Sequence, residues 1–233
     1  MAPQIVIESI TLDNLVLPDS VDPVVVGAVL AHTSRDGSQT EQIHATILEA
    51  INSGMYDIIL APEFTYVQHD GNDKNTNNME QQLLTKAEMD GCLNELISAS
   101  VGRDALVIPG TFQYEDERRF LPPNIAYAIY QGKVLHRHEK LHDSAYDFYW
   151  KNLHIGISIC SEAILERLSL DLLLHPSCGI SDYAGFGVKK NGHVITLDGQ
   201  YTPAGLLHIL QDHSTNWDRS YKKLWSAVVL KRQ

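Results

Sequence analysis

A cysteine at the end of a predicted strand is the side chain in this sequence best suited to nucleophilic chemistry. Residues 154–162 (HIGISICSE) alternate so that three isoleucines share one face of a strand, and Cys160 follows a glycine and a serine on the other face. Residues 161–168 then predict a helix. The free N–H groups of such a turn would favour a thiolate and a developing oxyanion, and the small residues would leave an open approach for a substrate. An inert buried cysteine is the alternative.

A carboxylate and a lysine also come directly after predicted strands. Residues 57–64 (DIILAPEF) predict a short apolar strand that a proline ends, with Glu63 just beyond it. Residues 124–140 predict a β-hairpin with a Gln-Gly turn, and its second strand ends at Lys140. Either residue alone could be an ordinary surface charge. Together with Cys160 they would supply an acid–base group, a cation and a thiol.

The elements that must position these side chains form an alternating pattern of strands and helices. Residues 1–22 predict an N-terminal arm or edge strand, and residues 23–233 a single domain. An Asn-Gly pair inside residues 188–197 predicts a second hairpin. The other expected elements are helices over 40–53 and 79–101, and strands over 23–31, 105–114, 170–176 and 224–230.

Composition narrows the classes of protein and of partner. The chain has 233 residues, 44% of them hydrophobic, which is enough for one globular domain with a full core. The net charge of -11, without a cluster of Lys and Arg, argues against a nucleic-acid partner. Three cysteines, an odd number, argue against a secreted disulfide framework and favour a cytoplasmic location. No apolar run is long enough to cross a bilayer, so we expect no membrane partner.

The Pro-Glu after one strand, the Glu-Lys after the hairpin and the Gly-Ile-Ser-Ile-Cys-Ser-Glu segment together resemble the nitrilase, or carbon–nitrogen hydrolase, superfamily in order and spacing. The resemblance runs from about residue 23 to about residue 200. It implies an α/β fold, a four-layer α-β-β-α sandwich, in a shortened member. It also implies a homodimer or a larger homo-oligomer, with no cofactor.

The resemblance implies a Glu-Lys-Cys triad, here Glu63, Lys140 and Cys160, that hydrolyses a small amide. Cys160 would attack the carbonyl and form a thioester, and Glu63 would transfer the protons. Lys140 and the backbone N–H of Ser161 would stabilise the oxyanion. An inactive binding or assembly module on the same scaffold, and an acyltransferase that uses the same thioester, are the alternatives.

Substrate-binding residues are expected at Gln113, His138 and Tyr146. The segment between the lysine and the cysteine is shorter than is usual in the family and lacks its second glutamate, which Asp143 or Asp147 could replace. Residues 177–187 are too few for the helix and strand that the family has there.

Three histidines, at positions 136, 138 and 142, share one face of the second hairpin strand with Lys140 and raise the alternative of a zinc site. No Cys, Asp or Glu is placed to complete such a site, and a lysine is a poor neighbour for a cation. We therefore expect no metal, and histidines that line or flank the pocket.

Overall fold

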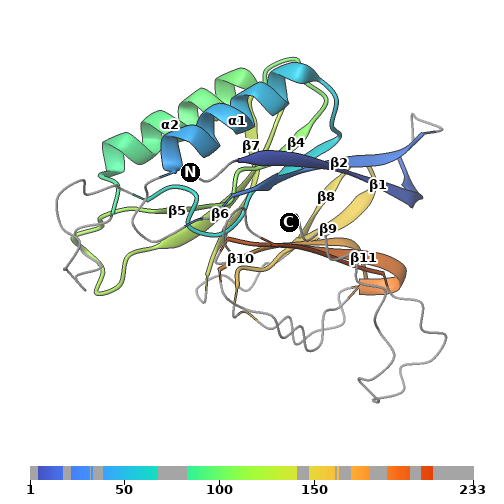
Figure 1. Ribbon diagram of the computed structural model, residues 1–233. Coiled ribbons are helices and arrows are strands. Elements are labelled where there is room, and N and C mark those ends of the chain that lie inside the picture. The colour runs from blue at the N-terminus through green and yellow to red at the C-terminus, as the bar shows by residue number, and fades with distance from the viewer. Residues whose placement is uncertain are drawn as a thin grey trace.

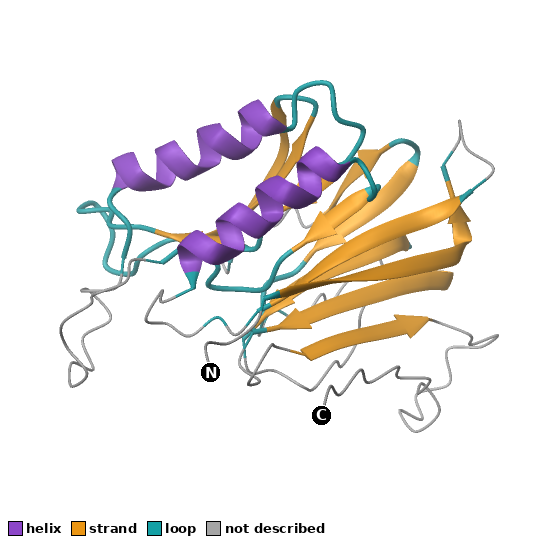
Figure 2. Ribbon diagram, turned by 45° about the horizontal axis from the view of Figure 1, so that its top comes forward, coloured by secondary structure: helices purple, strands orange, loops and turns teal. Residues whose placement is uncertain are grey.

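Two β-sheets lie face to face, and two helices cover the outer side of one of them (Figures 1 and 2). The computed structural model describes residues 5–17, 22–31, 33, 39–67, 83–140, 147–160, 162, 169–178, 188–199 and 206–211. Neither helix within these ranges has the length and apolar content needed to span a bilayer. The predicted strand over 224–230 and the helix after Ser161 fall outside the described residues.

The first sheet holds seven strands, and the three in its middle are parallel. In sequence order they are β1 (Val6–Val16), β2 (Pro23–Leu30), β3 (Ile58–Leu60), β4 (Leu106–Ile108), β5 (Thr111–Gln113), β6 (Asn124–Tyr130) and β7 (Lys133–Glu139). They pair in the order β1-β2-β3-β4-β6-β5, and β7 pairs with β6. β2, β3 and β4 run parallel and read as almost unbroken apolar segments, as expected for strands covered on both faces. β1 is antiparallel to β2 at one edge.

The two helices pack their apolar side on this sheet. α1 (Thr40–Ser53) has the predicted bounds, because Ile43, Ile47 and Ile51 recur at helical spacing and Gly54 ends the helix at a φ of 65°. α2 (Lys86–Ala99) begins later than predicted. Thr85 forms a capping box there, and Leu84 forms a β-bridge with Tyr114 instead of a helical turn.

The second sheet consists of β8 (Asp147–Trp150), β9 (Leu153–Ile157), β10 (Leu170–Ser177), β11 (Val188–Asp198) and β12 (Leu206–Gln211), in the order β12-β11-β10-β9-β8. The hairpin predicted at Asn191-Gly192 is wrong, because β11 is one strand, parallel to β10 and antiparallel to β12. Leu170 pairs with Val188 and Leu172 pairs with His193, so a step of two residues along β10 matches a step of five along β11. The Asn-Gly pair therefore lies in a bulge and not in a turn.

Two apolar cores fill the space between the helices and the two sheets. One lies between the sheets and includes Ile58, Ile155, Ile157 and Leu174; the other lies between the first sheet and the helices. The helix–sheet–sheet part of the predicted sandwich is thus present (Figure 1). Within the described ranges no helix lies on the outer side of the second sheet, where the fourth layer is expected.

Candidate active site

Glu63 lies in a turn directly after β3 that several backbone contacts hold in place. Phe64, the next residue, has a φ of 59°, which a non-glycine residue adopts only where its surroundings impose it. Its N–H donates to the Thr111 hydroxyl at 3.0 Å, and the Thr65 hydroxyl donates to the Pro62 carbonyl at 2.8 Å. The position of Glu63 is therefore fixed by its neighbours on both sides.

Gly110, in the connection between β4 and β5, completes this turn. Its φ is 84°, and a Cβ at this position would lie 2.1 Å from the Pro62 carbonyl oxygen and 2.4 Å from the Thr65 hydroxyl. No side chain fits there, so the glycine lets the two connections approach each other closely. This contact separates β4 from β5, which the sequence had predicted as one strand over 105–114.

The Glu63 carboxylate is completely buried and accepts two hydrogen bonds on one oxygen. Asn124 Nδ2 and Lys140 Nζ each donate to Glu63 Oε1 at 2.8 Å. The other oxygen, Oε2, has no hydrogen-bond partner among the described residues. The carboxylate is thus held by one oxygen while the other is open for proton transfer.

Lys140 directly follows β7, and its backbone N–H donates to the Asn124 carbonyl at 3.0 Å. His136 and His138 precede it at alternate positions. They pair with Ala128 and Ala126, which belong to the core between the sheets. This row therefore faces the second sheet, where the His136 ring stacks on Phe148 of β8 at 5.0 Å between ring centroids.

Cys160 lies three residues beyond the end of β9, at a backbone conformation that the sequence pattern did not predict. Its φ is 50°, its N–H donates to the Pro176 carbonyl at 3.0 Å, and its thiol packs against the core between the sheets. The predicted alternation would place this side chain on the face of Gly156, but the left-handed residue changes its direction. Leu170 fills the space beside Gly156, so the face of small residues is covered at that position.

The charges of Glu63 and Lys140 both act on the Cys160 thiol. Burial raises the pKa of the thiol, and the negative charge of the Glu63 carboxylate raises it further, while Lys140 lowers it. The net direction is upward, so Cys160 rests as a thiol, contrary to the thiolate expected from its turn. The structure thus brings together a carboxylate, an ammonium and a thiol from the ends of β3, β7 and β9.

His175 on β10 holds the other side of Cys160. Its Nε2 bonds to the Cys160 carbonyl at 2.8 Å, and its Nδ1 to the Thr196 hydroxyl at 3.1 Å. Burial lowers the pKa of His175 to about 4, so the ring is neutral at physiological pH. A carbonyl can only accept, so Nε2 carries the proton and Nδ1 accepts from Thr196.

Glu162 is a residue of this region that sequence analysis missed. Its Oε2 accepts from His138 Nε2 at 2.7 Å and from the Ile159 N–H at 2.8 Å, and both side chains of the pair are buried. His138, predicted to bind substrate, therefore lies in the protein interior beside Glu162. The position of Glu162, two residues after Cys160, was the available signal, but its hydrogen bond to a distant strand leaves no pattern in the neighbouring sequence.

The remaining predicted residues are placed only in part. Gln113 ends β5 and is half-buried, whereas Tyr146, Ser161 and Asp143 lie outside the described residues. Asp147, a candidate second acid, bonds to His154 at 2.5 Å. In the part of the chain that the structure describes, no three His, Cys, Asp or Glu side chains are grouped as metal ligands.

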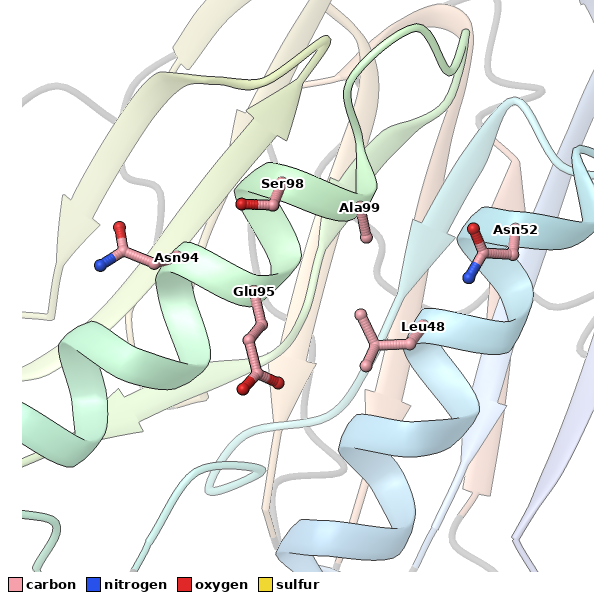
Figure 3. A pocket seen from close by; sticks show the side chains of 6 residues that line it. All are labelled: Leu48, Asn52, Asn94, Glu95, Ser98 and Ala99. Carbon is pink, nitrogen blue, oxygen red and sulfur yellow. The ribbon is translucent and has the colours of Figure 1, made fainter.

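A hollow lies between α1 and α2 (Figure 3), whereas Cys160 packs against the core between the two sheets. Six side chains line it: Leu48, Asn52, Asn94, Glu95, Ser98 and Ala99. None of the candidate catalytic residues is among them. Glu95 also bonds to His44 at 2.9 Å, which links the two helices. The hollow is therefore separate from the group around Cys160.

No protein-family model and no curated protein matches this sequence. Solved structures do match. An amidase from Nesterenkonia sp. AN1 has a TM-score of 0.54 at 13% identity, over 80% of this chain and 84% of that one. A CN-hydrolase superfamily protein from Xanthomonas campestris has a TM-score of 0.52 at 16% identity, over 79% and 81%. Nit3 of Saccharomyces cerevisiae, a nitrilase-superfamily member, has a TM-score of 0.52 at 13% identity, over 79% and 81%.

Proposed function

We propose, starting from the nitrilase-superfamily fold that these matches establish, that the protein hydrolyses a non-peptide C–N bond in a small amide. The observation that carries the proposal is the meeting of Glu63, Lys140 and Cys160 from three strand ends in two sheets. Acyl transfer needs a nucleophile, a group that moves its proton and positive charge near the oxyanion. These three side chains supply the three functions.

In the first half of the reaction, the Cys160 sulfur attacks the amide carbonyl while Glu63 accepts the thiol proton. A thiol with a raised pKa needs such a base, and Glu63 is close enough for its charge to act on the pKa of this thiol. Lys140 and the backbone N–H of Ser161 stabilise the tetrahedral oxyanion. Glu63 then gives the proton to the leaving nitrogen, the C–N bond breaks, and a thioester and a free amine or ammonia result.

In the second half, Glu63 takes a proton from a water molecule that attacks the thioester. The C–S bond breaks, the carboxylic acid leaves, and the proton returns to the Cys160 sulfur. One amide and one water thus give one acid and one amine, and the enzyme is regenerated. One structure of the Nesterenkonia amidase holds butyramide, and another carries the acetamide moiety of fluoroacetamide on its active-site cysteine, which supports a small amide as substrate and a nucleophilic cysteine here.

Within this proposal, Gln113 and Tyr146 contact the substrate. The protein works as a homodimer or larger homo-oligomer, as the family resemblance implies, which light scattering in solution would test. The location is cytoplasmic, where a reducing environment keeps a thiol nucleophile active.

Intact mass spectrometry with panels of small amides and nitriles tests the proposal, with Cys160→Ala as the matched control. We expect an acyl adduct on the wild type, none on Cys160→Ala, and release of the amine. Failure of every compound to acylate the wild type or release an amine would overturn the hydrolase and favour the binding or assembly module. If added amines capture the thioester as new amides faster than water does, the protein is an acyltransferase.

A further inference from the structure

Glu162 holds the turn that carries Cys160 by three hydrogen bonds. Its Oε2 accepts from the Ile159 N–H at 2.8 Å, its own N–H donates to the Ile159 carbonyl at 3.2 Å, and its carbonyl accepts from the Ser158 hydroxyl at 3.0 Å. Cys160 lies inside this turn with its φ of 50°. A non-glycine residue keeps such a conformation only where its surroundings determine it.

His138 connects this turn to the strand that carries Lys140. Its Nε2 donates to Glu162 Oε2 at 2.7 Å, and a carboxylate can only accept, so this nitrogen carries the proton. His138 precedes Lys140 by two residues in sequence, and β7 directs both toward the second sheet. The bond therefore joins β7 of the first sheet to the turn that follows β9 of the second.

The chemical nature of the pair indicates a geometric role. Both side chains are essentially inaccessible to solvent, and burying two ionisable groups stabilises a fold no better than apolar residues of similar volume. The surrounding contacts between the sheets are apolar and carry no strong directional preference. A hydrogen bond has a defined length and angle, so this pair can fix the separation of β7 and the Cys160 turn more narrowly than packing does.

We propose that Glu162 and His138 are positioning residues that set the Cys160 thiol against Lys140, so that an acyl carbonyl fits between them. This inference rests on the proposed function, since it assigns the pair to the same reaction. The two residues act through the backbone of Ile159 and through β7. A displacement of about 1 Å at a reacting atom reduces the rate on the order of 100-fold.

Glu162→Ala and Glu162→Gln separate this role from a merely stabilising one. The alanine variant loses both bonds of Oε2, and we expect the rate of thioester formation to fall on the order of 100-fold with little change in KM. The glutamine oxygen can still accept from the N–H groups of Ile159 and His138, so Glu162→Gln should keep most of the rate. Glu95→Ala is the matched control, because it breaks another Glu–His bond, on the outer helices.

His138→Leu and His138→Gln repeat the test from the other partner, which keeps the inference open to refutation if Glu162→Ala does not fold. The leucine variant loses the donor and should lose the rate, whereas the glutamine variant keeps an N–H donor and should retain most of it. A double variant, Glu162→Ala with His138→Leu, should be no slower than the slower single variant, because both remove the same link.

Two outcomes would overturn the positioning role. In one, Glu162→Ala or His138→Leu acylates within about threefold of the wild type. In the other, the glutamine variants are as slow as Glu162→Ala and His138→Leu, which would make charge and not geometry the cause.

Hydrogen exchange keeps this result distinct from failure of the proposed function. If the wild type is never acylated, the proposed function fails, but the Ile159 amide still reports on the turn. We expect this amide to exchange at least about tenfold faster in Glu162→Ala than in the wild type, with no change at Phe64 in the Glu63 turn. An unchanged Ile159 amide would show that Glu162 does not hold the turn, whatever the activity.

Discussion

The Glu63 turn and the Cys160 turn share a left-handed non-glycine residue, but different groups hold each turn in place. Each follows a parallel strand and contains a left-handed non-glycine residue, Phe64 in one and Cys160 in the other. The Glu63 turn is held by threonine hydroxyls, backbone groups and a glycine, none of which titrates. The Cys160 turn is held by the Glu162–His138 pair and by His175, which titrates with a pKa of about 4. The geometry of the Cys160 turn should therefore depend on pH more than that of the Glu63 turn.

Lys140 acts on both turns, because it donates a hydrogen bond to Glu63 and lowers the pKa of the Cys160 thiol. Its removal should have the largest effect. Lys140→Ala takes away the cation beside the oxyanion and the hydrogen bond to Glu63, so we expect kcat/KM for amide hydrolysis to fall by about 1,000-fold or more. Steady-state kinetics, with circular dichroism to show an intact fold, measure this. Lys133→Ala, on the exposed start of the same strand, is the control and should leave the rate unchanged. A Lys140→Ala variant within tenfold of the wild type would contradict the assignment.

Gly110→Ala tests whether the Glu63 turn depends on close backbone approach. The new Cβ would collide with the Pro62 carbonyl and adopt an unfavourable φ, so we expect roughly 3–4 kcal/mol of lost stability in urea unfolding. Gly102→Ala is the matched control, because Gly102 has a φ of 68° but nothing within 4 Å of its Cβ position. That variant should lose only about 1 kcal/mol. Equal losses would show that conformation alone, and not the contact, accounts for Gly110.

His175 tests the pH dependence expected of the Cys160 turn. The pKa of His175 is lowered from 6.5 to about 4 in the folded state, so the unfolded chain binds more protons between these values. The contribution of the neutral ring to the free energy of unfolding is fully present above about pH 6.5. It is lost as the pH falls toward 4, by up to roughly 3 kcal/mol.

Urea unfolding of the wild type and His175→Gln at several pH values between 7 and 4 measures this difference. The glutamine amide can donate to the Cys160 carbonyl and does not titrate, so its stability should fall less on acidification. Two variants that lose stability in parallel would contradict a neutral, buried His175.

Glu63→Gln should change the reactivity of the Cys160 thiol, the smallest of these effects. The Glu63 carboxylate raises the pKa of the thiol, so its neutralisation should move the midpoint of iodoacetamide alkylation to lower pH. Peptide mass spectrometry must follow Cys160 by itself, because Cys92 and Cys178 are also free thiols. A midpoint that stays in place, or rises, would mean that Glu63 does not influence the sulfur.

Local sequence patterns predicted α1 and the strands before Glu63 and Lys140, but not the contacts between the elements. α1 was predictable because helical spacing and a terminal glycine both mark it. The hairpin at Asn191-Gly192 was wrong because pairing of β11 with two neighbouring strands outweighs a local turn preference. The thiolate was wrong because burial of Cys160 and its proximity to Glu63 arise only in the folded chain. The same holds for His138 and Glu162, which are 24 positions apart.

A bulge in β7 determines which chemistry the site can have. Gln131 and Gly132 both have positive φ, as a tight hairpin requires, but the register that they start shifts by one residue between Val134 and His136. Side chains alternate along the strand, so an offset of one residue would send Lys140 toward the helices and direct the acidic Glu139 at the thiol. The electrostatic character of the candidate site is thus decided at Leu135, the extra residue of this bulge, five positions before the lysine.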